Sequence, residues 1–181
     1  MSALVGGVAG LLAVVYQLSF SFLNDQETQL PALTGLVGWW LPWLLAPVGG
    51  TLGWLAVWLT RRFAPSAGGS GIPHVKAVLL GLRQFQPVPL VATKLGAGLL
   101  ALAAGMSLGR EGPTIHIGAA CAAWLGLRMH APARTQKNLI AAGAGAGLAA
   151  AFNAPLAGFI FIMEELRREM SRLTYGSALV A

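Results

Sequence analysis

Two uncharged apolar runs near the start of the chain, Ser2 to Phe22 and Val37 to Thr60, are each long enough to cross a lipid bilayer. A spanning helix needs roughly 20 mainly apolar residues, and open loops and sheet edges are excluded at lipid depth. Only 10% of the residues are charged, whereas a soluble domain carries about a quarter. The sequence therefore predicts an all-α, polytopic membrane protein.

The charges beside these runs predict an orientation. The second run ends at Arg61 and Arg62, whereas residues 24–29, between the runs, hold Asp25 and Glu27 and no Lys or Arg. Because cytoplasmic loops carry an excess of Lys and Arg, we expect the Arg61 end and the amino terminus inside and a polar loop over 24–29 outside. No basic segment precedes the first run, which favours a retained span over a cleaved signal peptide.

Glycine and proline divide the rest of the chain. Breaks are expected at residues 64–73 and 109–113, because Gly and Pro at this density interrupt helices. The uncharged run over 138–163 is expected to be interrupted at Gly143, Gly145 and Gly147 and at Asn153-Ala-Pro155. His74 to Leu82 is too short to span and predicts a re-entrant, half-length helix. The remaining elements are helices over 88–108, 114–127, 134–147 and 153–168, a basic loop over 128–137, and a helix beginning at 174.

Glu111 is the only carboxylate in the apolar middle of the chain. An ionisable group at membrane depth costs on the order of 3 kcal/mol and indicates a functional site. Pro113 follows it, and Pro suits the first turn of a helix. We therefore expect Glu111 at the start of a helix inside the membrane, as a gate and proton carrier; a structural ion pair with Arg110 is the alternative.

The two breaks each direct a helix amino terminus toward the middle of the membrane. Such an end carries about half a positive charge and free N–H groups, which bind anions. Interrupted helices meeting at the bilayer centre are the usual construction of transporter sites. Ser70 adds a hydroxyl donor to the first break, so the pattern predicts an anion site between Ser70 and Glu111.

Other polar groups carry weaker signals. Glu164 and Glu165 are interpreted either as a solvated charge cluster or as a proton entry point on the inner side. His116 is expected to be a packing residue, and His74 with Lys76 to face cytoplasmic water. An intramembrane hydrolase using Ser70 or Ser107 with His116 is disfavoured, because no Gly-x-Ser-x-Gly elbow is present.

Several binding classes find no support. The net charge of +6 comes from basic residues scattered at helix ends, so no nucleic-acid surface is expected. Cys121 is the only cysteine and the histidines show no ligand spacing, so neither a disulfide nor a metal site is predicted. The Gly143-Ala-Gly-Ala-Gly147 run lacks the dinucleotide-binding spacing, and no cofactor is expected.

Three segments together resemble the CLC family of voltage-gated chloride channels and chloride/proton antiporters. They are Gly69-Ser-Gly-Ile-Pro73, Gly109-Arg-Glu-Gly-Pro113, and the run from Gly143 to Gly158 continuing through Glu164-Glu165. The resemblance covers nearly the whole chain. It implies the first inverted repeat of the CLC fold, with tilted, interrupted and re-entrant helices.

The resemblance also assigns roles. It implies that the selectivity filter is formed by Gly69, Ser70, Gly71, Ile72, Pro73, Gly109, Arg110, Glu111, Gly112 and Pro113. Ser70 would coordinate the central anion, Glu111 would be the external gate and outer proton carrier, and Glu165 the inner proton-transfer acid. The implied function is non-enzymatic chloride transport, as an antiporter or a voltage-gated-type channel. The implied partners are chloride, protons, the lipid bilayer and a second subunit in a homodimer, in a multi-pass protein of the inner or plasma membrane.

The chain departs from the family pattern in two ways. Residues 1–181 correspond to one transmembrane domain, the amino-terminal half; the third filter segment, the distal tyrosine and the family's amino-terminal helix are absent, and residues 179–181 are still apolar. Antiporter relatives often carry acids where His74 and Lys76 stand. The alternatives are a fluoride-preferring family member and a truncated, non-conducting fragment.

Overall fold

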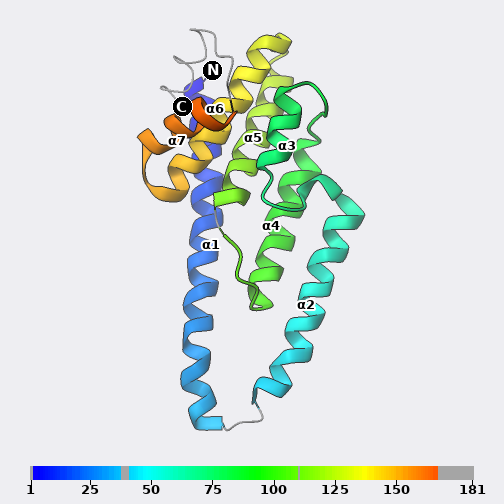
Figure 1. The fold of residues 1–181 in the computed structure, drawn as a ribbon, viewed down its shortest axis with the longest axis vertical. Helices are drawn as coiled ribbons and strands as arrows, with labels where there is room; N and C mark the ends of the chain where they lie inside the picture. Colours follow the sequence, from blue (N-terminus) through cyan, green and yellow to red (C-terminus); the bar gives the residue numbers. More distant parts are fainter. Residues whose placement is uncertain (1, 38–40, 110, 167–181) are drawn as a thin grey trace.

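A computed structural model of the chain describes residues 2–37, 41–109 and 111–166. The described residues form helices and connecting loops, in the order α1 (Ser2–Val37), α2 (Leu41–Phe63), a 3-10 turn (Pro65–Ala67), α3 (Ile72–Leu79), α4 (Pro87–Ala103), α5 (Glu111–Arg128), α6 (Ala133–Phe152), α7 (Pro155–Phe161) and a π-helical turn (Ile162–Leu166). In Figure 1, α1 and α2 extend to the lower end, while α3, α5, α6 and α7 gather at the upper end.

Helix α1 corrects one prediction. The expected polar loop over residues 24–29 is helical, and α1 continues through it to Val37. The segment contains no Gly or Pro, and its Gln and Glu residues are good helix formers, so nothing local ends the helix. Among the described residues, Ala3–Phe22 is the one stretch of helix that passes a length and hydropathy test for a membrane span.

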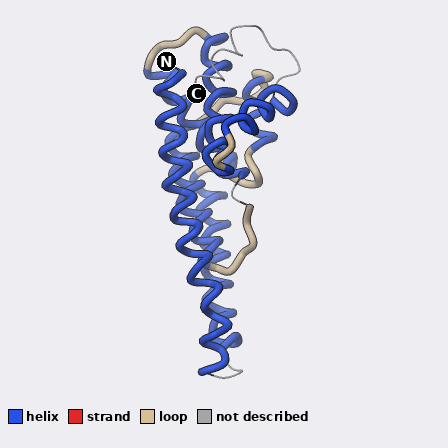
Figure 2. The backbone as a smooth tube through the Cα atoms, turned by 90° about the vertical axis from the view of Figure 1, so that its left-hand side faces the viewer, coloured by secondary structure: helices blue, strands red, loops and turns tan. Residues whose placement is uncertain are grey.

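The second predicted run, Val37 to Thr60, corresponds to helix α2, which begins at Leu41 and ends at Phe63. Residues 38–40, which fall within the predicted run, lie outside the described residues. Helix α4 packs against α2 and is apolar but only 17 residues long. Figure 2 shows the elongated outline, with the long helices running along the length of the molecule.

Helix α4 also ends earlier than expected, at Ala103 rather than 108. Gly105 adopts φ +77°, and the Met106 N–H donates to the Ala101 carbonyl at 3.1 Å. A left-handed residue followed by this six-to-one hydrogen bond is the Schellman motif, which closes a helix. The same bond closes α6, where Asn153 has φ +52° and the Ala154 N–H donates to Ala149 at 3.0 Å.

Helices α5 and α6 form the most extensive helix contact in the molecule. Their glycines allow the backbones to touch: a Cβ at Gly118 would overlap the Gly143 carbonyl, and one at Gly147 would overlap the Thr114 carbonyl. Small residues permit such close packing in membranes. Contrary to prediction, the glycines at 143, 145 and 147 do not interrupt the helix, which runs from Ala133 to Phe152. The predicted Asn153-Ala-Pro155 break is confirmed.

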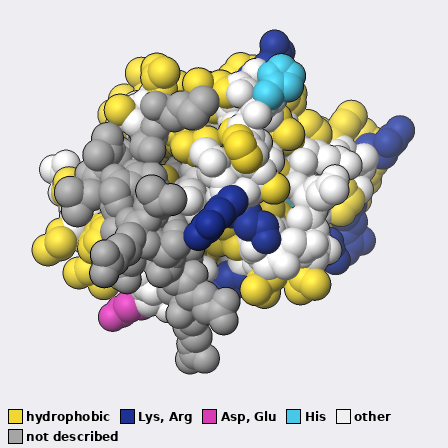
Figure 3. Space-filling model, turned by 90° about the horizontal axis from the view of Figure 1, so that it is seen from above, with side chains coloured by type: hydrophobic (Ala, Val, Ile, Leu, Met, Phe, Trp, Pro, Cys, Tyr) yellow, Lys and Arg dark blue, Asp and Glu magenta, His cyan; other side chains and the backbone are white. Residues whose placement is uncertain are grey.

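The predicted short helix is confirmed as α3, which runs for eight residues with Pro73 in its first turn. The basic loop is shorter than predicted, because α6 already begins at Ala133 and includes Arg134 and Lys137. The helix predicted from 174 lies outside the described residues. Viewed from the upper end of Figure 1, the visible described surface displays Lys and Arg more prominently than Asp and Glu (Figure 3).

Candidate functional site

The loop before α3 is shaped by two glycines. Gly69 has φ +70° and Gly71 has φ +87°, a left-handed conformation that other residues adopt only with strain. Gly71 is the residue that precedes the first helical residue, Ile72. Helix α3 therefore begins just after Ser70, and no side chain caps its amino terminus.

The second predicted segment provides the start of α5. Glu111 is the first helical residue, and the Thr114 hydroxyl donates to its carbonyl at 2.9 Å. Its carboxylate turns back toward Gly109, where an added Cβ would lie 3.4 Å from Oε2. A carboxylate at a helix amino terminus is stabilised by the helix dipole. The predicted filter residue Arg110 lies outside the described residues.

The structure brings the two segments together. A Cβ on Gly112 would lie 2.7 Å from the Ser70 carbonyl oxygen and 3.0 Å from the Ser70 Cα, so α5 begins directly against the Ser70 backbone. Both segments line a cavity of about 770 Å³, to which Gly69, Ser70, Gly109, Glu111, Gly112 and Pro113 contribute. Ile72 lies partly buried at the start of α3, packed against the core cluster of α3, α5 and α6.

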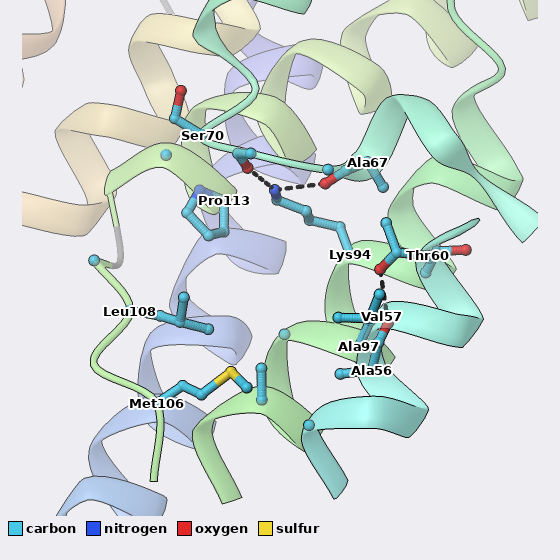
Figure 4. A pocket seen from close by; sticks show the side chains of 18 of the residues that line it. Ala56, Val57, Thr60, Ala67, Ser70, Lys94, Ala97, Met106, Leu108 and Pro113 are labelled. Carbon is cyan, nitrogen blue, oxygen red and sulfur yellow. Dashed lines mark hydrogen bonds between the residues drawn. The ribbon is translucent and has the colours of Figure 1, made fainter. Parts of the chain in front are cut away.

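Ser70 lies at a boundary between two cavities. It lines the large cavity on the Glu111 side and also a second cavity, of about 360 Å³, with Pro73, His74 and Arg83. Figure 4 shows its side chain on the far side of the loop from Lys94, with Pro113 nearby. An anion moving from one cavity to the other would therefore pass the Ser70 loop.

Sequence reasoning missed the cation of this site. Lys94 of α4 is 8% exposed, and its ammonium donates hydrogen bonds to the carbonyls of Ala67 at 2.8 Å and Gly69 at 2.5 Å (Figure 4). It lines the large cavity with Glu111. The available signal was a single Lys inside an otherwise uncharged apolar helix, which by itself marks a functional position.

The structure also pairs two histidines. His74 Nδ1 and His116 Nε2 are 2.8 Å apart and hydrogen-bonded, so the half-buried His74 turns one ring nitrogen toward His116 while it also lines the second cavity. The His116 side chain is fully buried against Gly71, where an added Cβ would overlap its ring. A separation of 42 residues gave no sequence signal. Among the described residues, no cluster of three metal-ligating side chains is found.

The predicted inner acid, Glu165, lies away from the Ser70 loop. It forms an ion pair with Lys76 of α3, and both side chains are partly exposed, 48% and 41%. This contact links the π-helical turn after α7 to α3. The acid is therefore connected to the helix that presents the Ser70 loop, and its predicted role in proton transfer stays a prediction.

Fold and site together define a class: an all-helical membrane protein in which the segments that precede or begin two helices, at Ser70 and Glu111, line one cavity. The family model described as "Voltage gated chloride channel" matches residues 52–181. The chain belongs to this family, as the resemblance of its three motifs predicts.

Similar proteins agree with this assignment. The chain is 41% identical over 171 residues to an H(+)/Cl(-) exchange transporter ClcA of Klebsiella pneumoniae, and 38% identical over 170 residues to the ClcA of Vibrio campbellii. Each alignment covers 92% of this chain and 36% of the relative, so the chain spans about a third of their length. The crystal structure of a slow cyanobacterial Cl-/H+ antiporter matches with a TM-score of 0.90 at 38% identity, over 99% of this chain and 43% of that one. The chain therefore has the polytopic CLC fold.

Proposed function

We propose that this chain forms the amino-terminal half of a chloride/proton antiporter, embedded as a multi-pass protein in the inner or plasma membrane. The observation that carries the proposal is the meeting of two helix amino termini at Ser70 and Gly112, beside one cavity that holds Glu111 and Lys94. Oriented N–H groups, two helix dipoles and a buried ammonium all favour an anion there. Relatives that carry the exchanger name support antiport over a pure channel.

In this proposal Ser70 coordinates the anion from the loop, and Glu111 occupies the same donors when no anion is present. Once protonated, the Glu111 carboxyl no longer competes as an anion and carries its proton outward. Glu165 receives protons on the inner side, where its partial exposure and its contact with Lys76 keep it within reach of water. The remaining anion ligands come from a second half, and the whole assembles as a homodimer.

Reconstitution into liposomes tests the proposal. The chain is purified alone and together with the carboxyl-terminal half of a ClcA relative, and chloride efflux and proton uptake are recorded. We expect proton-coupled chloride efflux in at least one of the two preparations. Absence of chloride flux in both, with folded protein, would leave the non-conducting fragment as the correct description. Faster fluoride than chloride efflux would favour the fluoride-preferring alternative.

The variant Glu111→Gln tests whether Glu111 carries protons, separately from the conduction of chloride. The amide keeps the size of the carboxyl group but cannot carry a proton, so chloride flux should persist while proton uptake is lost. Glu164→Gln, next to the predicted inner acid, serves as the control that retains coupling, whereas Glu165→Gln should reduce it. Unchanged proton uptake in Glu111→Gln would contradict the gate assignment.

A further inference from the structure

Lys94 places a positive charge in the wall of the large cavity, and no carboxylate of the described residues forms an ion pair with it. Its side chain is 8% exposed, and among the described residues its hydrogen-bond partners are the carbonyl oxygens of Ala67 and Gly69. A buried ammonium is costly unless it is hydrogen-bonded or paired. Here the loop satisfies the ammonium, and in return the ammonium fixes which way the loop carbonyls point.

The direction of these carbonyls determines where the neighbouring N–H groups point. A peptide group is planar and trans, so its N–H points opposite to its C=O. Because Lys94 binds the Gly69 carbonyl, the Ser70 N–H points away from Lys94. The Ala67 carbonyl is bound as well, and the Gly68 N–H of the same peptide donates to Pro65 at 3.3 Å.

The N–H groups that follow are available to a ligand. In the part of the chain that the structure describes, no backbone hydrogen bond is found for the N–H groups of Gly69, Ser70 or Gly71. Gly69 and Ser70 are exposed and line the large cavity, so their N–H groups are open to water or to an anion. Carbonyl oxygens repel an anion and N–H groups attract it, so a loop with the opposite carbonyl orientation would lose its preference for anions.

We propose that Lys94 is a positioning residue for anion selection: it holds the carbonyls of residues 67 and 69 toward α4, so that the Ser70 N–H points to the other side of the loop, where it meets an anion passing Ser70. This inference rests on the proposed function, because it assigns the residue that orients the loop of the same site. Chloride is strongly hydrated and needs a dense set of donors to replace its water. A weakly hydrated anion such as thiocyanate needs fewer, so loss of the orientation penalises chloride more.

The test uses the liposome assay, with the carboxyl-terminal half supplied if the wild type requires it. Lys94→Met keeps the approximate length of the side chain and removes its charge and its hydrogen bonds to Ala67 and Gly69. We expect the KM for chloride to rise about tenfold or more, and the chloride-to-thiocyanate rate ratio to fall, since hydrogen bonds from charged donors are the stronger ones. Lys94→Arg keeps charge and donors and should stay near the wild type. Gly96→Ala, on the same helix but outside the cavity lining and with nothing within 4 Å, should leave both quantities unchanged.

A chemical rescue separates positioning from packing, and it also applies if Lys94→Met fails to fold. Lys94→Cys is made with Cys121→Ala, and the purified protein is treated with 2-bromoethylamine, which restores an ammonium on a thioether. Treatment with the neutral bromoethane, which leaves an ethyl thioether without an amine, is the control. Recovery of chloride preference with the amine alone supports the inference, whereas equal recovery with both reagents, or wild-type selectivity in Lys94→Met, overturns it. A wild type without chloride flux would instead contradict the proposed function.

Discussion

The α5–α6 contact and the cavity beside α4 are built from the same small residues and have opposite properties. Between α5 and α6, glycines lie inside unbroken helices, so their backbone groups are already hydrogen-bonded and the two backbones touch without a gap. Around Ser70, glycines with positive φ lie outside helices and leave backbone N–H groups to face a cavity. The glycine content of a membrane segment therefore does not separate packing from binding; its backbone conformation does.

The largest effect is expected where a side chain would enter the closed contact. Gly143→Ala places a Cβ against the Gly118 carbonyl and 2.6 Å from the Ala122 Cβ, so α5 and α6 must separate. We expect a loss of about 3 kcal/mol in the free energy of unfolding, the upper part of the range for overpacked cores. Titration with denaturing detergent measures it. Gly96→Ala, at a helical position with nothing within 4 Å, should change stability little; equal losses would show that the contact is looser than described.

A smaller effect distinguishes the two glycines of the Ser70 loop. Gly69→Ala and Gly71→Ala both force alanine into a left-handed conformation, which costs roughly 1–2 kcal/mol. Only Gly71→Ala also meets the His116 ring, whereas nothing lies within 4 Å at Gly69. The same titration should therefore find Gly71→Ala less stable than Gly69→Ala by about 1 kcal/mol or more. Combining Gly71→Ala with His116→Ala should recover part of that difference, and no recovery would contradict the contact.

The smallest effect belongs to the ion pair outside both regions. Lys76→Met and Glu165→Gln each remove one partner of a pair whose side chains are about half exposed. Exposed pairs contribute about 0–1 kcal/mol, so each variant should lose less than 1 kcal/mol. A double-mutant cycle measures the coupling between the two. A coupling well above this range would place the pair in a drier environment than the structure describes.

The sequence predicted the features that depend on local chemistry. The break before Ile72, the short α3, the start of a helix at Glu111 and the break at Asn153 all follow from Gly, Pro and Asn at particular positions. The predicted polar loop over residues 24–29 is wrong, because polar residues without Gly or Pro do not by themselves end a helix. The predicted interruption of α6 at its glycines is also wrong. These glycines lie inside the helix, where the α5 backbone packs against them.

Two parts of the site depend on tertiary structure and could not be predicted in detail. Lys94 is visible in the sequence as an isolated charge, yet its partners are carbonyls, which every residue carries. The His74–His116 hydrogen bond joins residues that become neighbours only when α3 packs beside α5. The roles of the filter residues and of Glu165 stay predictions until the flux experiments are made.

The burial of Lys94 bears on how the chain enters the membrane during synthesis. Insertion of an unpaired Lys near the centre of an apolar helix costs about 3 kcal/mol. Its acceptors, Ala67 and Gly69, precede it by 27 and 25 residues and leave the ribosome first. If α2 and its loop wait beside the translocon, the ammonium of α4 meets them as it arrives. The order of translation thus matches the order of pairing, because the acceptors of Lys94 are synthesised before α4.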